Sequence, residues 1–369
     1  MKFTCDLKTL NEAVTNISLA VSQRSNITAL EGVLLECTGD ELTLTGYNLE
    51  LGIRKTIPVR GEESGNIVLN ARIFSDILRK AQSDTIKIST DEKLLTLLSA
   101  GNANFTILGI SKEEYPDIPQ IDESESLSIR SSVLKSMIRQ TIFAVAVTDQ
   151  NPLITGSLFD IKNGNLHIVS VDGYRLALAK ETVDYSGEKN FVVPGRTLQE
   201  ISKLMPDEEE AQVTVQVGNK HIIFIIDGYY VISRLLEGEF LNYNATIPDG
   251  ATTKLRVKTR EFIDIIDRVS IIINDKRKPP VKCELSDGMM SLFCESSIGK
   301  VDDQMPVQME GASLKIGFNN KYMTDALKAT EADEIYLEFN GPVSPIKLLP
   351  LEGESFLFLV LPVRLKDGN

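Results

Sequence analysis

A stretch at the start of the chain occurs three times, and this repeat limits the possible folds more than any other feature. FTCDLKTLNEAVTNISLAV opens the chain, LSIRSSVLKSMIRQTIFAV begins at Leu127, and LRVKTREFIDIIDRVSIII begins at Leu255. Each copy is a short alternating run, then a residue able to cap a helix, then apolar residues at helical spacing. The matched residues Leu10, Leu134 and Phe262 lie 124 (134 − 10) and then 128 (262 − 134) residues apart. The repeat predicts three copies of one domain.

The remainder of each copy repeats as well. GVLLECTGDELTLTGYNLELGIRKTIPV in the first copy matches GSLFDIKNGNLHIVSVDGYRLALAKETV in the second, and VKCELSDGMMSLFCESSIGKVDDQMPV in the third is a looser match. Asp and Gly between β-rich runs predict hairpins. A second helix is expected over Ala71–Ala81, Gly195–Met205 and Asn320–Ala329, followed each time by further strands. The pattern predicts an α+β fold of three repeated domains, each with two helices packed on antiparallel sheets.

Proline-containing segments mark two equivalent joints between the copies. YPDIP, which starts at Tyr115, precedes the acidic IDESESL, and YNATIPDG starts at Tyr243. These joints predict domains over residues 1–121, 122–248 and 249–369, each of about 120 residues. Short, proline-marked connectors are stiff. Successive domains would therefore repeat one rotation, and the chain would curve.

The net charge of −13 argues, taken alone, against nucleic-acid binding, but its distribution is uneven. Acidic residues cluster in predicted loops at 62–63, 122–125, 207–210 and 331–334. Basic residues instead lie on or beside the six predicted helices: Lys8, Arg24, Arg72, Arg79, Lys80, Lys135, Arg139, Arg196, Lys203, Arg260, Arg268, Lys276, Arg277, Lys278, Lys321 and Lys328. Either these are the solvated faces of amphipathic helices, or all six helices line one shared positive surface while the exterior stays negative.

Patterns typical of enzymes are missing from the sequence. The two histidines, His167 and His221, lie in strand-like runs, and no HExxH, Walker-type or GxGxxG motif occurs. The four cysteines lack metal-site spacing and are expected to be buried thiols. The start of the chain lacks a secretory pattern, and no apolar run reaches membrane-spanning length. We expect a cytoplasmic protein with no catalytic residues, no metal, no cofactor and no membrane contact.

Two features exceed what a scaffold needs. The first is VDGYRL, starting at Val171, whose counterpart in the first copy is taken to be TGYNL; Gly46 and Gly173 would both serve a tight turn, but the turn does not require Arg175. The second is the apolar run at 355–365. It is either plain core, or its Leu361–Pro362–Val363 end forms the lip of an exposed groove, since proline suits the edge or end of a strand.

Five separated segments, MKFTCDLKTL, VDGYRLAL, LEGEFLNY, GFNNKYMTDAL and LVLPVRL, closely resemble the β subunit of bacterial DNA polymerase III, the sliding clamp. The resemblance covers the whole chain. It implies a head-to-tail homodimer, closed into a six-domain ring around double-stranded DNA, that tethers the polymerase without reading sequence. It also implies a groove that binds short linear motifs of the DNA polymerase III α subunit, the clamp loader, and other polymerases and repair proteins. The alternative is a repeat-built protein-interaction scaffold that does not enclose DNA; an enzyme with an unfamiliar site is a third hypothesis.

The resemblance also assigns residues to these surfaces. The DNA-binding residues would be Arg24, Arg72 and Arg196, with the loop holding Thr148 and Gln150, joined by the helix bases Arg79, Lys80, Arg139 and Lys203. Phe105 and Ile272 would lie at the dimer interface. The partner groove would comprise Ile154, Val171, Gly173, Tyr174, Arg175, Leu176, Leu241, Thr246, Asn319, Tyr322, Val343, Ser344, Val360, Leu361, Pro362, Val363 and Arg364. Leu241 and Ala245 depart from a Pro and an Arg of some members, and residues 366–369 extend past the usual end.

Overall fold

The computed structural model describes residues 1–121, 125–273 and 279–365 of the 369-residue chain. The predicted boundary at 121/122, most of the acidic cluster at 122–125, Lys276–Lys278 and the terminal extension therefore lie at the edge of or outside the described residues. Two compact units form, Met1–Ser132 with Gln199–Leu235, and Val133–Leu198 with Leu236–Asn369. The second copy of the repeat thus contributes to both units. None of the described helices is both long and apolar enough to cross a membrane.

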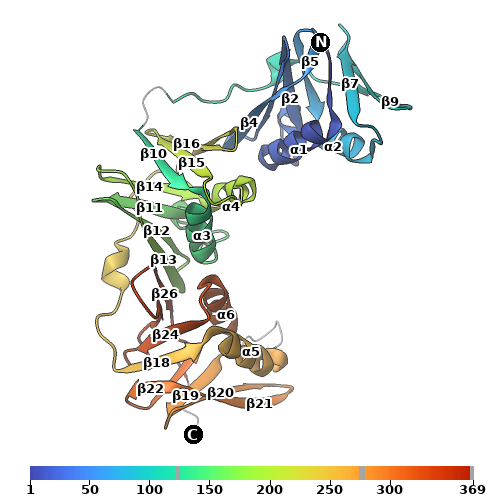
Figure 1. Ribbon diagram of the computed structural model, residues 1–369. Helices are drawn as coiled ribbons and strands as arrows, with labels where there is room; N and C mark the ends of the chain where they lie inside the picture. Colours follow the sequence, from blue (N-terminus) through green and yellow to red (C-terminus); the bar gives the residue numbers. More distant parts are fainter. Residues whose placement is uncertain (122–124, 274–278, 366–369) are drawn as a thin grey trace. The chain divides into compact units, whose positions relative to one another are not determined.

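The first unit holds two antiparallel sheets and the helices α1 (Leu7–Ile17) and α2 (Ala71–Lys80) (Figure 1). The five-stranded sheet has the order β5-β1-β7-β8-β9, and the eight-stranded sheet has the order β10-β15-β16-β17-β4-β3-β2-β6. The strands are β1 (Lys2–Asp6), β2 (Gly32–Thr38), β3 (Glu41–Tyr47), β4 (Leu51–Pro58), β5 (Arg60–Glu63), β6 (Gly65–Asn70), β7 (Thr85–Thr90), β8 (Leu95–Ala100), β9 (Ala103–Leu108), β10 (Glu125–Arg130), β15 (Gln212–Val217), β16 (His221–Ile226) and β17 (Tyr229–Arg234).

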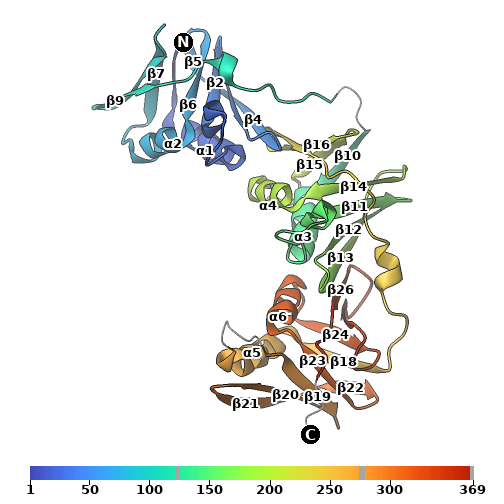
Figure 2. The ribbon, with the colours of Figure 1, turned by 180° about the vertical axis from the view of Figure 1, so that it is seen from behind.

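The second unit has the same plan, with helices α5 (Thr259–Val269) and α6 (Asn320–Ala329) (Figure 2). Its nine-stranded sheet has the order β14-β11-β12-β13-β26-β25-β24-β18-β22, and its four-stranded sheet has the order β21-β20-β19-β23. The strands are β11 (Gly156–Lys162), β12 (Asn165–Val171), β13 (Arg175–Thr182), β14 (Lys189–Pro194), β18 (Thr253–Lys258), β19 (Val281–Ser286), β20 (Met289–Ser296), β21 (Gly299–Pro306), β22 (Gln308–Gly311), β23 (Leu314–Phe318), β24 (Glu334–Phe339), β25 (Ile346–Pro350) and β26 (Phe356–Val360).

The remaining helices are α3 and α4 and six short 3₁₀ helices. Each of α3 and α4 spans the sequence division between the two units. Their bounds, with those of the 3₁₀ helices, are α3 (Ser131–Ile142), α4 (Gly195–Leu204), η1 (Ser18–Ala20), η2 (Thr28–Glu31), η3 (Lys112–Glu114), η4 (Pro152–Thr155), η5 (Tyr243–Thr246) and η6 (Ser270–Ile272).

The helices begin where the repeat predicts, although one of the predicted caps is absent. The Asp6 carboxylate accepts a hydrogen bond from the Thr9 backbone N–H at 2.7 Å and starts α1. In the third copy the N-cap residue of α5 is Lys258, which makes no side-chain cap. The Thr259 hydroxyl there donates to the Ala332 carbonyl oxygen at 2.6 Å instead, tying the helix start to the loop before β24. The prediction of a capping residue is therefore wrong for this copy.

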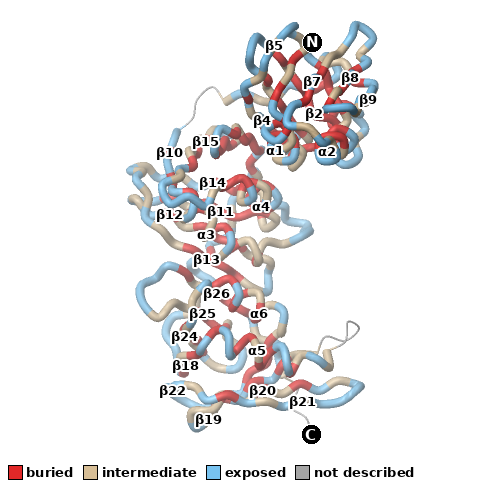
Figure 3. The backbone as a smooth tube through the Cα atoms, turned by 45° about the vertical axis from the view of Figure 1, so that its right-hand side comes forward, coloured by how far each residue is buried: buried red, intermediate tan, exposed pale blue. Residues whose placement is uncertain are grey.

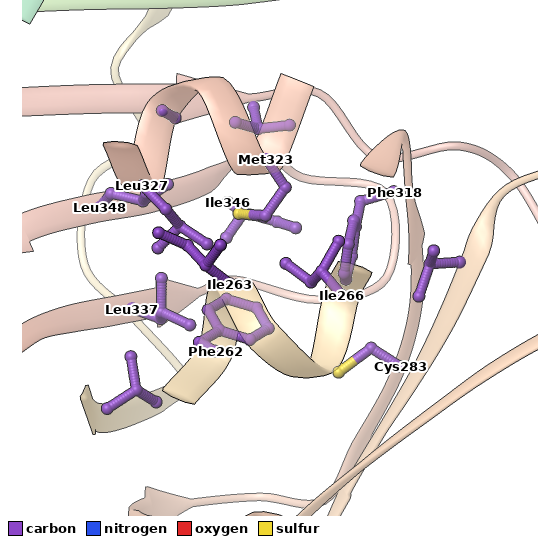
Figure 4. Close-up of a cluster of buried hydrophobic side chains, with 14 of the residues drawn as sticks. Phe262, Ile263, Ile266, Cys283, Phe318, Met323, Leu327, Leu337, Ile346 and Leu348 are labelled. Atoms are coloured by element: carbon purple, nitrogen blue, oxygen red, sulfur yellow. The ribbon is translucent and has the colours of Figure 1, made fainter. Parts of the chain in front are cut away.

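The third copy illustrates how the helices are held on the sheet. Apolar residues of α5 at steps of three and four, such as Phe262 and Ile266, point toward Met323 and Leu327 of α6 (Figure 4). Strand residues such as Leu337 close the cluster from the sheet side. Burying a side chain of this size stabilises the fold by about 1.5–3 kcal/mol. The apolar spacing noted in the sequence is thus the packing face of the helix.

Burial follows the strands and the inward helix faces, while loops are exposed (Figure 3). The four cysteines are buried and free, as predicted. Burial raises the pKa of the Cys5 and Cys283 thiols to about 12, so these groups stay protonated and unreactive. The acidic pair at 62–63 lies on edge strand β5 rather than in a loop, and Glu62 bonds Lys2 at 2.8 Å and Lys87 at 2.7 Å. Its predicted loop position is wrong.

Each unit contains a joint at which strands of successive copies pair into one continuous sheet. In the first unit β4 of copy one pairs antiparallel with β17 of copy two, with Ile53 opposite Val231. In the second unit β13 of copy two pairs antiparallel with β26 of copy three, with Ala177 opposite Phe358. All four of these residues are fully buried. The two joints use equivalent strands in the same register.

Candidate functional site

The turn between β12 and β13 is shaped by one carboxylate and one glycine. The Asp172 Oδ1 atom accepts hydrogen bonds from the backbone N–H groups of Tyr174 at 2.9 Å and Arg175 at 3.0 Å. Gly173 has φ +86°, a conformation that suits glycine. The turn leaves the Tyr174 side chain 60% exposed. The turn thus presents a large aromatic ring with a polar hydroxyl to the outside of the unit.

The first copy makes the same turn three residues later than the sequence comparison placed it. There Asn48 Oδ1 accepts from the N–H groups of Glu50 at 3.0 Å and Leu51 at 2.8 Å, and Leu49 has φ 75°. Gly46 lies inside β3, where an added Cβ would be 2.4 Å from the Ile17 carbonyl oxygen. The prediction that Gly46 serves the turn is wrong: this glycine allows the close approach of α1 to the strand.

Arg175, which the turn does not require, has a guanidinium group in contact with two carboxylates and two aromatic rings. Its Nε lies 3.0 Å from Asp172 Oδ2 and its Nη1 lies 2.6 Å from Asp325 Oδ2. Its guanidinium carbon is 4.7 Å from the ring centroid of Tyr322 and 5.3 Å from that of Phe143. Only 9% of the side chain is exposed. Arg175 therefore links the start of β13 to α6.

The N-terminal end of α6 supplies the aromatic partner of Tyr174. Asn319 caps the helix by accepting from the Tyr322 backbone N–H at 3.2 Å. The Tyr322 ring stacks on Tyr174 with centroids 5.8 Å apart and planes at 25°. Burial is the main cause that raises the pKa of the Tyr322 hydroxyl, so the ring stays neutral. The two tyrosines form one aromatic face made from copies two and three.

The apolar C-terminal run combines both roles that the sequence left open. Phe358 and Val360 of β26 are fully buried between β13 and β25, so this part is core. Beyond the strand, Leu361 and Val363 are 40% and 37% exposed. The Leu361 N–H donates to the Tyr174 carbonyl oxygen at 2.9 Å, and the Val363 N–H donates to the carbonyl oxygen of Gly317 at 2.8 Å. The run therefore ends as an exposed apolar lip beside Tyr174.

The connector between copies two and three packs on the same sheet. Tyr243 is buried in a cluster with Leu176, and its hydroxyl donates to Asp160 Oδ2 at 2.8 Å and lies 3.1 Å from His167 Nδ1. Burial is the main cause that raises the pKa of this Tyr243 hydroxyl and lowers the pKa of His167. Leu241 precedes this anchored residue and is 36% exposed. The connector thus carries an exposed apolar side chain two residues before its buried tyrosine.

The residues proposed for the groove all belong to the second unit, but the contacts join only part of the set. Sheet pairing, stacking or packing in one cluster connects Val171, Tyr174, Arg175, Leu176, Asn319, Tyr322, Val360 and Leu361. Ile154 lies on η4 beside this cluster, and Val343 and Ser344 lie in the loop between β24 and β25. Val343 and Arg364 are exposed. Gly173 shapes the turn, Thr246 donates to the Tyr243 carbonyl oxygen at 2.7 Å, and Pro362 separates the two lip residues.

The residues proposed to meet DNA are all exposed. Within the first unit Arg24 and Arg72 line one hollow, together with polar residues of η1 and α2. Three other bases are paired with acids: Arg79 with Asp76, Lys203 with Glu200 and Arg139 with Glu331. The described residues show no ion pair for Arg24, Arg72, Lys80 or Arg196, and Thr148 and Gln150 are exposed in the loop after α3. Among the described residues, Arg24 and Arg72 are thus exposed cations without an ion pair, and the carboxylate of Glu31 lines the same hollow.

The residues proposed for the dimer interface lie at sheet edges or beside them. Phe105 is on β9, the last strand of the five-stranded sheet, and is half-buried. Ile272 ends η6, packed against the core of the second unit, and the adjacent Ile271 is 77% exposed. The last strand of the four-stranded sheet is β21. Each unit therefore presents an unpaired strand edge with apolar side chains near it.

Sequence reasoning missed Asp325, Phe143 and the Tyr243–Asp160–His167 group. Asp325 lies three positions after Tyr322 on α6, so the two share a helix face, and this spacing was the available signal. No local pattern signals the contact of Arg175 with Asp325, because 150 residues separate them. The described residues contain no cluster of three or more His, Cys, Asp or Glu side chains able to hold a metal.

Comparisons with known proteins match the whole chain. Family models for the N-terminal, central and C-terminal domains of the DNA polymerase III beta subunit match residues 1–119, 128–242 and 244–364 of this chain, in that order. The beta sliding clamp of Bacillus subtilis is 34% identical over 377 residues, covering 99% of this chain and 100% of that protein.

Solved structures are equally similar. A putative DNA polymerase III beta subunit from Eubacterium rectale has a TM-score of 0.94 at 36% identity and covers 98% of this chain and 99% of its own. The DNA polymerase sliding clamp of Bacillus subtilis has a TM-score of 0.96 at 34% identity, covering 99% of this chain and 100% of its own. These matches favour the clamp over an interaction scaffold that does not enclose DNA.

Proposed function

We propose, from the premise that this chain belongs to the DNA polymerase III beta subunit family of sliding clamps, that two copies close head to tail into a ring around duplex DNA. The chain is a non-catalytic subunit that serves DNA replication. A closed ring holds a polymerase on its template by topology, so its contacts with DNA can be weak enough to slide. We assign its three modules to residues 1–121, 122–248 and 249–369.

The observation that carries this proposal is the joint that the chain makes twice. The first joint pairs the third strand of the β-rich run of one copy (β4) with the last strand of the next copy (β17), and the second pairs β13 with β26 in the same way. The equivalent third-copy strand is β21, and the equivalent first-copy last strand is β9. Both are sheet edges within the chain. A third, identical joint would pair β21 of one chain with β9 of another.

The internal joints also predict the register of that third joint. Val301 on β21 is equivalent to Ile53 and Ala177, and Phe105 on β9 is equivalent to Val231 and Phe358. Val301 and Phe105 should therefore face each other across the interface, with Lys300 opposite Thr106. The four internal counterparts are fully buried, whereas Val301 and Phe105 are half-buried in the single chain. Head-to-tail contacts of this kind close into rings when the rotation allows it.

Engineered disulfides test the proposed ring. Lys300 and Thr106 are exposed, so replacing each with Cys perturbs the fold little. A chain with Lys300→Cys and Thr106→Cys should form a covalent dimer on oxidation, because directly opposed residues of paired strands bring their Cβ atoms nearest to the distance a disulfide needs. The matched control, Lys300→Cys with Asn104→Cys, is two residues out of register and should cross-link far less. Equal cross-linking of both pairs, or none of either, would contradict the proposed joint.

For the DNA-facing surface we propose the exposed helix bases, chiefly Arg24 and Arg72, with Arg196, Lys80 and the loop at 148–150. Contacts of Arg and Lys with phosphates are independent of sequence and weaken with salt. Replacing Arg24 and Arg72 with Glu should sharply reduce loading onto nicked circular DNA and lower the salt dependence of binding by about one unit per lost phosphate contact. Unchanged loading would show that this surface does not face DNA.

For the partner site we propose the apolar surface around Tyr174, Tyr322 and the lip residues Leu361 and Val363. An aromatic face beside exposed aliphatic side chains suits the anchor residues of short peptides. Its partners would be the DNA polymerase III α subunit, the clamp loader, and other polymerases and repair proteins. Deleting residues 361–365 should abolish binding of the purified α subunit while the dimer survives. Retained binding would exclude this surface as the site.

A further inference from the structure

Asp325 bonds Arg175 of the proposed partner groove but has no part in the peptide-binding set described above. Its Oδ2 atom lies 2.6 Å from Nη1 of Arg175, whose Nε bonds Asp172 at 3.0 Å. The Arg175 side chain is 9% exposed, and those of Asp172 and Asp325 are 13% and 29% exposed. A guanidinium that is held by two carboxylates on a side chain only 9% exposed has little freedom to rotate.

The held guanidinium in turn orders the aromatic face. It lies 4.7 Å from the Tyr322 centroid, within the range of a cation–π contact, and Tyr322 stacks on the exposed Tyr174 at 5.8 Å. The Tyr174 carbonyl oxygen accepts from the N–H of the lip residue Leu361. Asp325 therefore lies at one end of a continuous series of contacts, and the exposed residues Tyr174 and Leu361 lie at the other.

We propose that Asp325 is a positioning residue of the partner groove: through Arg175 it holds Tyr322 and Tyr174 in the stacked arrangement that a partner peptide meets. This inference rests on the groove proposed above. It also assigns Arg175 a supporting role, because its charge is matched by two carboxylates of the protein itself. An arginine held in this way does not act as a free cationic contact for an acidic peptide residue.

A purely structural role for Asp325 makes a different prediction. The Arg175–Asp325 pair joins copy two to copy three, so it could serve only the stability of that joint. In that case its loss would lower the unfolding temperature while leaving the two tyrosine rings as they are. A positioning role predicts the opposite: changed tyrosine rings and weaker binding in a protein that stays folded and dimeric.

Three variants of the full-length dimer separate these roles. Asp325→Asn keeps the shape but removes the charge, Asp325→Glu restores the charge, and Glu334→Gln removes a carboxylate from another arginine pair of the same unit, Arg256–Glu334, outside the groove. Affinity for the purified DNA polymerase III α subunit would be measured by surface plasmon resonance. The tyrosine rings would be followed by ¹⁹F NMR of 3-fluorotyrosine-labelled protein, with Tyr174→Phe and Tyr322→Phe used to assign the lines.

We expect Asp325→Asn to weaken binding about tenfold, the size of a lost charge-assisted hydrogen bond, and to shift the Tyr174 and Tyr322 lines of the free protein. Asp325→Glu should recover most of the affinity, and Glu334→Gln should bind normally. Normal binding by Asp325→Asn, or weak binding with unshifted lines, would overturn the positioning role. If binding also survives deletion of residues 361–365, the groove itself is wrong; if only the deletion abolishes binding, the groove stands and the role of Asp325 does not.

Discussion

The two joints between successive copies share one backbone plan but present different surfaces. In both, a turn is closed by an Asx side chain, and the residue that follows the last strand pair of the joint donates its N–H to a turn carbonyl oxygen. That bond runs from Leu361 to Tyr174 at 2.9 Å in the second unit and from Arg234 to Glu50 at 2.9 Å in the first. Tyr174 and Leu361 at the second joint thus correspond to the charged residues Glu50 and Arg234 at the first. The same frame thus displays exposed apolar side chains at one joint and charged side chains at the other.

The connectors of the two joints differ in the same way. In the first, the Tyr115 hydroxyl donates to the Thr45 carbonyl oxygen at 3.3 Å, and Ile118 lies close to Gly52 of β4. The hollow beside it is lined by charged residues, including the ion-paired Lys112 and Glu36. In the second, Tyr243 bonds a carboxylate and lies beside a histidine. Repetition therefore conserves the anchoring tyrosine but not its hydrogen-bond partners.

The largest expected effect comes from emptying the core of the second joint. Phe358 is fully buried, and the centroid of its ring lies 5.3 Å from that of Phe143 and 4.9 Å from that of Phe356. Phe358→Ala should lower the free energy of unfolding by about 3–5 kcal/mol, measured by urea denaturation. Val231→Ala at the equivalent place in the first joint should cost less, because valine is smaller and its loss removes fewer buried atoms. Equal or reversed losses would show that the two joints are not packed alike.

Exchanging the two residues joined by this backbone bond at each joint tests whether side chains alone distinguish the joints. Tyr174→Glu with Leu361→Arg copies the charged pair of the first joint into the second. The variant should fold, because the first joint carries the same pair on the same backbone, but it should lose at least about 2 kcal/mol of affinity for the α subunit. The reverse exchange, Glu50→Tyr with Arg234→Leu, should gain no binding, since the first joint lacks the arginine-held aromatic face. A gain in binding would mean that these two residues alone are enough to make the site.

Removing the hydroxyls of the two anchoring tyrosines, Tyr243 and Tyr115, should lower the free energy of unfolding by unequal amounts. Tyr243→Phe leaves the partly buried Asp160 carboxylate without this donor and should cost about 1–2 kcal/mol of stability. Tyr115→Phe loses a single longer bond to a backbone carbonyl and should cost about 0.5–1 kcal/mol. Calorimetry on the two single variants compares them directly. A larger loss for Tyr115→Phe would show that the carboxylate partner of Tyr243 adds less stability than a backbone carbonyl does.

The smallest expected effect is on the pH dependence of stability. Burial, and then the Lys180 charge, lowers the pKa of His167 below its ordinary value of 6.5. Unfolded chains therefore bind the proton more readily, so His167 contributes stability above pH 6.5 that is lost as the pH falls below this value. His167→Gln should flatten the decline between pH 7 and 5 in thermal unfolding. His221 has its pKa lowered mainly by burial as well and serves as the comparison in the first unit.

Local patterns account for how much of the fold could be predicted. Apolar steps of three and four define one buried helix face, so all six helices were predicted, and α6 at its observed limits. Gly46 was misassigned because a glycine next to a polar residue looks the same in a turn and beneath a helix. Only the position of α1 over β3 shows that its missing Cβ makes room for Ile17.

For the candidate sites, the sequence indicated some of the residues but not the contacts between them. Tyr174, Arg175 and the apolar end of the chain stood out as residues that the fold did not require. Their contacts could not be inferred from spacing, because Arg175 meets Asp325 and Val360 across more than a hundred residues. The boundaries of the modules and the residues that meet DNA or a second chain remain proposals for the experiments above.

The sequence by itself determined the threefold repeat, the helix and strand order, and the excess of basic residues near the helices, because each depends on neighbours along the chain. Only the tertiary structure decided that β4 pairs with β17 and β13 with β26, and which side chains gather at each joint. Backbone hydrogen bonds between strands are the same for any residue, so strand pairing across a hundred residues leaves no local pattern to read.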